Sequence, residues 1–345
     1  MRRTMALVRL FFLIALFNIF GIQNAQAEET DQFTLPPIEL VDIGPTASRK
    51  LYEILGNVIA QTNFEIQTLI PKSKNSRYAA SKLASLFRGA GFADLVYNKT
   101  GPGFPRWMRW SRLPHEIKPL QYKEKWPWNN VYWLAFSQSP SSLLGLAPTI
   151  NMYNYHFGTD KLGHFFMMGH SYYKIYENYL NQGKSSQKAH AAIVTYGQIL
   201  EQTYLGTLIN GIYSNADLSA NYAGWKFYRN LTHRVKIGGR ILPPILILKG
   251  DKWEFSQQVN KNTLLKPFLS DNLNEALNPC RYTFTRNRIR NQVKKRCADW
   301  IAREGITHQK VIVKLEENSR WHGESYGHWL PASDAVTLNS CFGGQ

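Results

Sequence analysis

The chain has 345 residues and three cysteines, 44% of its residues are hydrophobic, and its formal net charge at pH 7 is +17. This length suffices for one large domain or two small ones. The basic charge is not accompanied by a helix-turn-helix, zinc-finger or RNP-like pattern, so nucleic acid is not an expected partner. The sequence contains no internal repeat and no low-complexity tract.

The first 27 residues predict a secretory signal peptide. Arg2, Arg3 and Arg9 lead into an apolar run that continues to Phe17, and Ala25-Gln26-Ala27 supplies an A-x-A cleavage site. A retained membrane anchor is the alternative, although the run is shorter than the roughly 20 residues of a spanning helix. Cleavage removes three arginines and no acids, which lowers the formal charge from +17 to +14. We therefore expect a periplasmic or outer-membrane-associated protein that meets an anionic lipid or glycan surface.

Residues 28–149 predict an N-terminal region with helices and a segment rich in tryptophan and proline. Prolines indicate an extended segment over 28–48, and helical periodicity follows near 51–59 and 79–87. Between 105 and 136, five tryptophans lie among basic residues and four prolines. Indole rings beside cations suit a membrane interface or a sugar-binding groove. The alternative is a proline-rich loop whose tryptophans pin it to the core.

Residues 150–232 predict a compact helical bundle at the centre of a mainly α fold. Apolar periodicity indicates helices near 159–180, 188–209 and 215–230, separated by short polar linkers. Polar residues interrupt these helices too often for membrane-spanning segments.

Residues 233–345 predict a basic C-terminal extension of mixed α and β structure. Residues 241–248 resemble a short buried strand or a turn that leans on a membrane, and 311–315 alternate like an edge strand. The stretch 281–300 predicts a helix with one strongly basic face. That face is either simply solvated or a contact for anionic lipid or glycan.

The cysteines, Cys280, Cys297 and Cys341, lie in the last quarter of the chain. An exported chain is in a compartment that permits disulfides, so one bridge and one leftover thiol are expected. The pairing stays open. Cys280 and Cys297 can pair only if the chain folds back between them, because a continuous helix would hold them about 25 Å apart. The sequence has no C-x-x-C pair, so the cysteines are not expected to bind a metal.

The candidate functional residues are polar side chains at helical spacing inside otherwise apolar stretches. Asp160 and His164 share a face of the first helix, and Glu201 lies on the packing face of the second. The third helix presents one stripe, formed by Asp217, Asn221, Gly224 and Tyr228. Burying such groups without partners is costly, so we expect them to meet. The complete candidate set is Asp160, Lys161, His164, Glu201, Asp217 and Asn221.

Two chemistries fit this set. In one, His164 is a general acid or base oriented by a carboxylate, and Lys161 or Asn221 stabilises developing negative charge. In the other, Asp160, His164, Glu201 and Asp217 bind a divalent metal that activates water. The mixed nitrogen and oxygen ligands suit zinc, manganese or iron, but no H-E-x-x-H motif decides for a metal. The cofactor is therefore left open.

Each residue also has a structural interpretation. Thr159 can cap the first helix, which leaves Asp160 in a first turn where an acid complements the helix dipole. Ser214 and Asp217 are spaced like a capping box. His164 can be a core histidine, and Glu201 can pair with a lysine.

The ordered motifs resemble a known family. They are D-K-x-x-H-F from Asp160, G-x-x-x-E from Gly197 to Glu201, and S-x-x-D-x-x-x-N-x-x-G from Ser214 to Gly224. Over residues 158–226 they look like the VanZ-like proteins and the related YfiM-type envelope lipoproteins. The resemblance implies a small helical module of the bacterial envelope, in a family that includes a teicoplanin-resistance protein, and it singles out the same six residues. The chain departs from the family in lacking clear membrane helices and a lipidation cysteine, and in its large extensions.

A competing motif lies near the C-terminus. Residues 323–327 satisfy the G-x-S-x-G pattern of serine hydrolases, with Ser325 as the nucleophile. The acid and the histidine that should follow occur in the reverse order, as His328 and then Asp334, so we interpret the match as a chance one. His322 and His328 have no carboxylate at a spacing that specifies a metal.

Two functional hypotheses follow. In the first, the chain is an envelope enzyme, a hydrolase or transferase that acts on a lipid-linked or glycan substrate through the six polar residues. In the second, it is a non-catalytic envelope module that holds a membrane surface or a partner, and the same residues form a buried structural network. The first requires the residues to line a pocket that solvent reaches. The oligomeric state is not decided by the sequence.

Overall fold

The computed structural model describes residues 29–101, 122, 129–132, 146–203, 205–207, 211–283, 285–321 and 335–343. The predicted signal peptide, almost all of the tryptophan-rich stretch and the G-x-S-x-G match lie outside the described residues. The described part is mainly helical, which confirms the predicted class.

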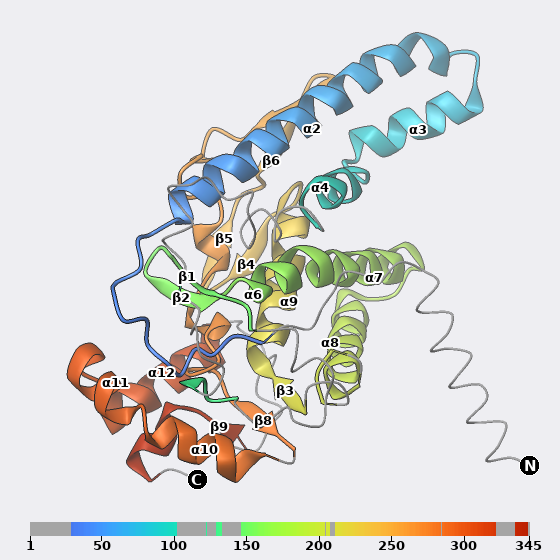
Figure 1. The fold of residues 1–345 in the computed structure, drawn as a ribbon. Coiled ribbons are helices and arrows are strands. Elements are labelled where there is room, and N and C mark those ends of the chain that lie inside the picture. Colours follow the sequence, from blue (N-terminus) through green and yellow to red (C-terminus); the bar gives the residue numbers. More distant parts are fainter. Residues whose placement is uncertain are drawn as a thin grey trace, which may run out of the picture.

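Helices dominate the chain, and strands are short (Figure 1). The α-helices are α2 (Gly44–Ser73), α3 (Arg77–Phe87), α4 (Phe92–Thr100), α6 (Asp160–Gly163), α7 (Gly169–Asn181), α8 (Ser186–Gln202), α9 (Asn215–Asn230), α10 (Arg286–Lys294), α11 (Cys297–Glu304) and α12 (His308–Trp321). A π-helical turn, η4 (His164–Met168), joins α6 to α7, and 3₁₀ turns occur at η5 (Lys266–Phe268), η6 (Asp271–Leu273) and η8 (Leu338–Phe342). The strands are β1 (Thr149–Met152), β2 (Tyr155–Gly158), β3 (Ile212–Ser214), β4 (Val235–Ile237), β5 (Arg240–Leu242), β6 (Leu246–Lys249), β7 (Lys252–Phe255), β8 (Cys280–Tyr282) and β9 (Ala335–Val336).

The strands form small antiparallel sheets that fasten segments together. β1 and β2 make a hairpin whose turn residues, Tyr153 and Asn154, have φ angles of 57° and 67°. A two-residue turn with both φ angles positive matches the twist of the strands that it joins. β8 pairs with both β3 and β9, so one sheet joins the middle of the chain to its end. β4–β5 and β6–β7 are separate hairpins.

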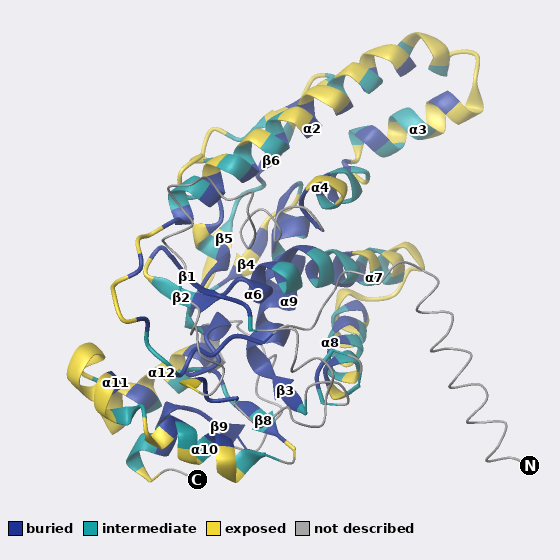
Figure 2. Cartoon of the chain, in the orientation of Figure 1, coloured by how far each residue is buried: buried dark blue, intermediate teal, exposed yellow. Residues whose placement is uncertain are grey.

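Helix α9 lies at the centre of the fold. Fourteen of its sixteen residues are buried, including polar ones, and Figure 2 shows it dark along its length. It packs against η4, α7, α8, β4 and the 3₁₀ turns η5 and η6. Its predicted bounds, 215–230, are confirmed. A helix that is buried on every side must satisfy its polar side chains inside the protein, which makes its contacts the starting point for the site.

The helix predicted over 159–180 is continuous but not regular. It runs from Asp160 to Asn181 and contains the π turn η4, in which the N–H of Gly169 donates to the carbonyl of His164. Tyr228 on α9 donates its hydroxyl to the carbonyl of Phe166 within this turn at 2.9 Å. The Tyr228 side chain of α9 therefore satisfies one carbonyl of the irregular turn.

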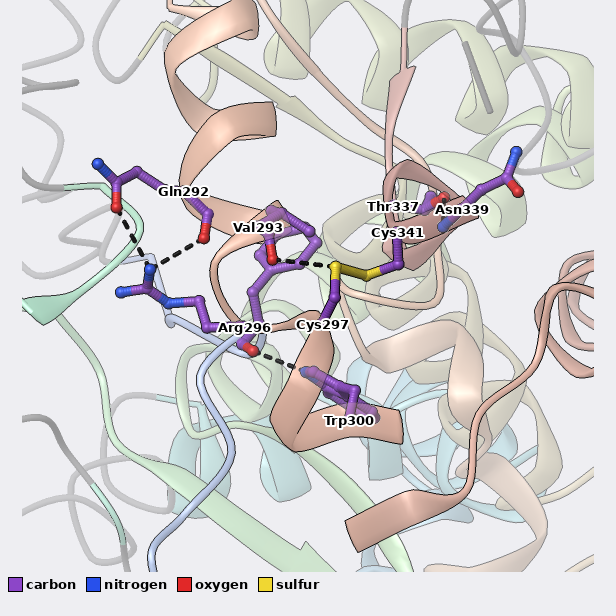
Figure 3. The surroundings of a disulfide bond; sticks show 9 residues. Gln292, Val293, Arg296, Cys297, Trp300, Thr337, Asn339 and Cys341 are labelled. Carbon is purple, nitrogen blue, oxygen red and sulfur yellow. Dashed lines mark hydrogen bonds between the residues drawn. A yellow bond between two sulfur atoms is a disulfide. The ribbon is translucent and has the colours of Figure 1, made fainter. Parts of the chain in front are cut away.

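A disulfide joins Cys297, at the start of α11, to Cys341 in η8 (Figure 3). On the same helix, Trp300 donates its indole N–H to the carbonyl of Phe33 at 2.7 Å. Helix α11 thus holds both the first and the last described segments. Cys280 is free and buried. The expected count of one bridge and one leftover thiol is confirmed.

Several local predictions were wrong. Residues 311–315 lie inside α12 rather than in an edge strand, because the pattern is too short to separate the two periods and Val311 packs inward with a helical repeat. The basic stretch 281–300 is not one helix: Arg281 lies in β8, and α10 and α11 are separated at Lys295 and Arg296.

Other element boundaries moved. Helix α2 runs from Gly44 to Ser73 and is much longer than the predicted helix near 51–59. Its early start makes the extended first segment shorter than the predicted 28–48. Helix α8 ends at Gln202 instead of 209. Residues 241–248 contain the end of β5 and the start of β6 rather than one strand, since two prolines separate them. None of the described helices has both the length and the apolar content needed to cross a membrane.

The crossing of α7 and α9 generates the first prediction. A Cβ atom added to Gly224 would overlap the carbonyl oxygen of Phe165, and one added to Gly169 would lie 2.6 Å from the Gly224 Cα atom. We expect Gly224→Ala to lower the free energy of unfolding by about 2–3 kcal/mol, because the backbones must separate. Gly56→Ala is the control, since nothing lies within 4 Å of its added Cβ in α2 and the change should be neutral or stabilising. Urea unfolding measures both; equal stability of the two variants would contradict the close crossing.

Candidate functional site

A buried lysine ammonium is the centre of the site. Lys161 is fully buried, and its Nζ donates to Asp160 Oδ2 at 2.7 Å, to Asp217 Oδ1 at 2.5 Å and to Glu275 Oε1 at 2.5 Å. An ammonium has three N–H donors and no acceptor. All three donors of Lys161 are therefore used, each by a different carboxylate.

Two helix N-termini bring these groups together. Asp160 is in the first turn of α6, and Asp217 is in the first turn of α9, which Ser214 caps by accepting from the Asp217 N–H at 3.2 Å. Carboxylates are stabilised there because backbone N–H groups and the helix dipole favour negative charge. Glu275 follows the 3₁₀ turn η6, which packs against α9. The capping function expected of Ser214 is confirmed, whereas Thr159 makes no side-chain capping hydrogen bond.

A second layer of hydrogen bonds closes the network from outside. Thr30 donates its hydroxyl to Asp160 Oδ1 at 2.7 Å, and Tyr132 donates to Glu275 Oε2 at 2.7 Å. Gln32 accepts from the backbone N–H of Glu275. Residues from before α2, from the segment 129–132 and from after η6 thus surround the lysine. We define Lys161, Asp160, Asp217 and Glu275 as the Lys161 cluster.

The cluster fixes its own charge state. Burial opposes the charge on Lys161, but Asp160, Asp217 and Glu275 together hold the pKa of the ammonium well above its usual range. Burial likewise opposes ionisation of Asp160, yet the charge and hydrogen bond of Lys161, with the hydrogen bond from Thr30, hold its pKa below the usual range. Burial raises the pKa of Glu275 despite the lysine. One ammonium offsets the charge of only one carboxylate, and the raised pKa of Glu275 favours its neutral form, which lowers the remaining buried negative charge.

His164 and Asn221 lie beside the cluster. His164 Nε2 is 3.5 Å from Asp217 Oδ2, and its Nδ1 is 3.1 Å from Asn221 Oδ1. The His164 side chain is 11% exposed, against 3% for Asp217. The predicted stripe on α9 is observed in full: Asp217 contacts Lys161, Asn221 contacts His164, Gly224 lies on Phe165, and Tyr228 bonds Phe166.

Glu201 is buried nearby but serves another group. Its Oε1 accepts from the backbone N–H of Ser214 at 2.9 Å, and no described lysine or arginine forms an ion pair with it. Burial, followed by the negative charge of Asp217, raises the pKa of Glu201 well above its usual range. Its carboxyl group thus holds the junction between β3 and α9. The alternative of a Glu201–lysine pair is not observed among the described residues.

The sequence interpretation missed four members of the network, Gln32 among them. Glu275, Thr30 and Tyr132 lie more than 100 residues from at least one of the groups that they contact. Glu275 follows an asparagine-rich stretch that reads as a surface turn, although Asn272, Asn274 and Glu275 are buried. Only the pairing of residues across the fold reveals their involvement.

The carboxylates have the spacing of a possible metal site. One oxygen each from Asp160, Asp217 and Glu275 lie within 4.8 Å of one another. This set differs from the predicted one, because Glu275 takes part while His164 and Glu201 do not. The ammonium of Lys161 already donates to all three carboxylates, so a divalent cation would have to displace it. The arrangement of the three carboxylates therefore suits the Lys161 ammonium better than a bound metal ion.

Comparison with known proteins adds no assignment. No protein-family model matches the chain, and neither a curated protein nor a solved structure matches it. The likeness of residues 158–226 to VanZ-like proteins is therefore a prediction from motifs.

The saturated ammonium generates the second prediction. Lys161→Met leaves three buried carboxylates without their shared cation, so we expect the free energy of unfolding to fall by about 3–5 kcal/mol at neutral pH. Lys174→Met removes a lysine whose ion pair with Asp94 is half-exposed, and should change stability by no more than about 1 kcal/mol. Urea unfolding compares the two variants. A Lys161→Met protein as stable as the control would show that the cluster does not hold the fold together.

Glu201 generates a prediction about pH. A carboxyl whose folded pKa is raised contributes stability that is present below its usual value of 4.5 and is lost as pH rises through the folded pKa. Glu201→Gln keeps an oxygen for the Ser214 N–H and cannot ionise. Its stability relative to the parent protein should therefore increase as the pH rises above the usual value of 4.5, as measured by urea midpoints. Glu201→Ala should instead lose about 1–3 kcal/mol because the buried N–H of Ser214 has no acceptor. A constant loss in Glu201→Gln at every pH would refute this role.

Proposed function

We propose that the chain is an exported protein of the bacterial envelope that binds an anionic surface, and that the Lys161 cluster is a structural network. The structural role of the Lys161 cluster is supported by the fact that its polar groups bond one another and are buried. Lys161 has no N–H left to offer a substrate, and Asp160, Lys161, Asp217 and Asn221 are each at most 4% exposed. Catalytic groups must touch a substrate, whereas these touch one another.

A buried network of this kind can determine how segments meet. Each N–H of Lys161 meets a different carboxylate only when the start of α6, the start of α9 and the segment after η6 keep one mutual arrangement. We propose that the chain is organised as a compact bundle at 150–232 between a tryptophan-rich N-terminal region and a basic C-terminal extension, with Thr30 and Glu275 joining the segments on either side to the bundle.

The anionic surface is suggested by helix α10 and the residues after it. Ile289 and Val293 of α10 are buried in an apolar cluster, and Arg286 and Arg290 are half-buried. Arg288, Lys294 and Lys295 are exposed, and we call them the α10 basic face. Arg296 is different, since its guanidinium bonds Thr34 and Gln292 and belongs to the packing. Each basic residue near an anionic membrane contributes about 1 kcal/mol of attraction.

The location rests on the sequence. The pattern of residues 1–27 favours export, and the motifs of residues 158–226 resemble a family of the bacterial envelope. A basic exported protein meets phospholipid headgroups, lipopolysaccharide or acidic glycans, which share anionic oxygens.

The α10 basic face generates the fourth prediction. Replacing Arg288, Lys294 and Lys295 with Gln should weaken sedimentation with phosphatidylglycerol vesicles at least about tenfold at low salt. The control replaces three exposed cations on the α2–α3 hairpin, Lys72, Lys74 and Arg77, with Gln, which gives the same change in net charge. Competition by an acidic polysaccharide identifies a glycan rather than a lipid as the better ligand. If both triple variants lose the same amount of vesicle binding, the binding depends only on net charge, and the assignment to the α10 basic face is refuted.

A second candidate is the envelope hydrolase or transferase. It is favoured by His164, whose side chain is partly exposed, lies beside Asp217 and belongs to a π turn, a feature often found at functional sites. Turnover of a lipid-linked or glycan substrate that His164→Ala abolishes, with unfolding unchanged, would establish this candidate in place of the first.

A further inference from the structure

The residues that directly follow the predicted cleavage site are buried. Four consecutive residues have exposed fractions of at most 7%: Glu29, Thr30, Asp31 and Gln32. The carbonyl of Glu29 accepts from the N–H of Ala147 at 2.8 Å, and Figure 1 shows the segment before α2, in blue, running toward α6. The first residues of a domain are usually poorly ordered unless contacts tie them down. The segment that starts at Glu29 is therefore part of the packed interior.

This segment is joined to the Lys161 cluster. Thr30 donates to Asp160 Oδ1 at 2.7 Å, and Gln32 accepts from the backbone N–H of Glu275. Glu29 precedes both. Burial raises the pKa of Glu29 well above its usual range, and the negative charge of Glu275 raises it further. The carboxyl group of Glu29 thus lies within electrostatic reach of the cluster.

The buried charges in this region are out of balance. Among the residues that the structure describes, Lys161 is the one buried cation. Five buried carboxyl groups belong to the cluster or interact with it electrostatically: Glu29, Asp160, Glu201, Asp217 and Glu275. Since a single ammonium balances one carboxylate, each further carboxylate must take up a proton or meet another cation. A second cation placed here would find negative charge to stabilise it.

Cleavage of the signal peptide creates a cation at the neighbouring residue. Hydrolysis of the Ala27–Glu28 peptide bond by a signal peptidase consumes one water molecule and leaves a carboxylate on Ala27 and a protonated α-amino group on Glu28. Consecutive Cα atoms are about 3.8 Å apart and an N–Cα bond adds about 1.5 Å, so this nitrogen is within about 5.3 Å of the Glu29 Cα atom. The new charge therefore stands beside the first buried carboxyl group of the described chain.

We propose that the α-ammonium group of Glu28, formed by cleavage, pairs with the carboxylate of Glu29 and acts as a second internal cation beside the Lys161 cluster. In the uncleaved chain a neutral peptide group occupies this position, and Glu29 stays protonated. Removal of the signal peptide thus completes the charge balance at the centre of the fold and stabilises it. This inference rests on the proposed export and cleavage, and it is independent of the α10 basic face.

The test compares two chains that differ in where the ammonium stands. One begins at Glu28, and the other begins at Ala25, which moves the ammonium three residues away. NMR of isotope-labelled methyl groups on the amino terminus measures its pKa. The pKa should lie well above the ordinary range of about 7.7–8.0 in the 28–345 chain and within that range in the 25–345 chain.

Urea unfolding gives a second readout. The unfolding equilibrium constant at pH 7 should be about tenfold smaller for the 28–345 chain than for the 25–345 chain. An amine whose folded pKa is raised stabilises the fold below its unfolded pKa and loses this effect as the pH rises through the folded value. The difference between the two chains should therefore decrease as the pH rises above about 8.

Two variants identify the partner of the ammonium. Glu29→Gln should return the pKa of the amine to its ordinary range and abolish the stability difference between the two chains. Glu39→Gln is the matched control, since it removes an exposed carboxylate from the same segment and should change neither quantity. The comparison of the two unaltered chains does not depend on the folding of either variant.

The proposal is overturned if the amine has the same pKa in both chains, or if the two variants lower that pKa equally. It is also overturned if mass spectrometry shows that the exported protein begins at a residue other than Glu28. These outcomes are separate from those that test the α10 basic face. Loss of vesicle binding leaves the pairing of Glu28 with Glu29 intact, and an ordinary amine pKa leaves the surface assignment intact.

Discussion

Taking a lysine ammonium out of water is the constraint on which the centre of this protein depends. An isolated ammonium in a protein interior costs several kcal/mol or more, and one carboxylate rarely compensates because its own dehydration must also be offset. Lys161 has a separate carboxylate for each N–H, and two of these carboxylates stand at helix N-termini. The capping of α9 by Ser214, the support of Ser214 by Glu201 and the closure by Thr30 and Tyr132 all follow from holding those carboxylates in place.

The sequence could predict those features of this arrangement that depend on the spacing of residues within one helix. The bounds of α9 follow from Ser214 and from the apolar periodicity, and the stripe from Asp217 to Tyr228 follows from residues three and four apart. Three packed helices were predicted to bring together Asp160, His164, Glu201, Asp217 and Asn221. His164 does meet Asp217 and Asn221, whereas Glu201 accepts from the Ser214 N–H instead. Their chemical role was not predictable in the same way, because helical spacing shows which side chains meet but not whether a substrate reaches them.

The contacts that escaped prediction are those between distant segments. Glu275 is 114 residues from Lys161, and nothing near it in sequence distinguishes it from a solvated acid. The break between α10 and α11 escaped because arginine and lysine are good helix formers. Arg296 there bonds Thr34 and the carbonyls of Asn129 and Gln292, so tertiary contacts overrule helix propensity. Val311 illustrates the opposite error, since five residues of apparent alternation are too few to exclude a helix.

The π turn between α6 and α7 has a consequence for how one helix can serve two neighbours. A single extra residue in a helical turn rotates everything beyond it by about 100° relative to a regular α-helix. Lys161, before the turn, and His164, the first residue of the turn, contact the first turns of α9. Beyond the turn, the same helix presents the bare backbone of Gly169 to Gly224. A regular α-helix keeps the same rotational phase along its length. It could face α9 either with its polar side chains or with its glycine backbone, but not with both. By changing phase once, this helix docks along α9 as two differently faced segments joined without a loop.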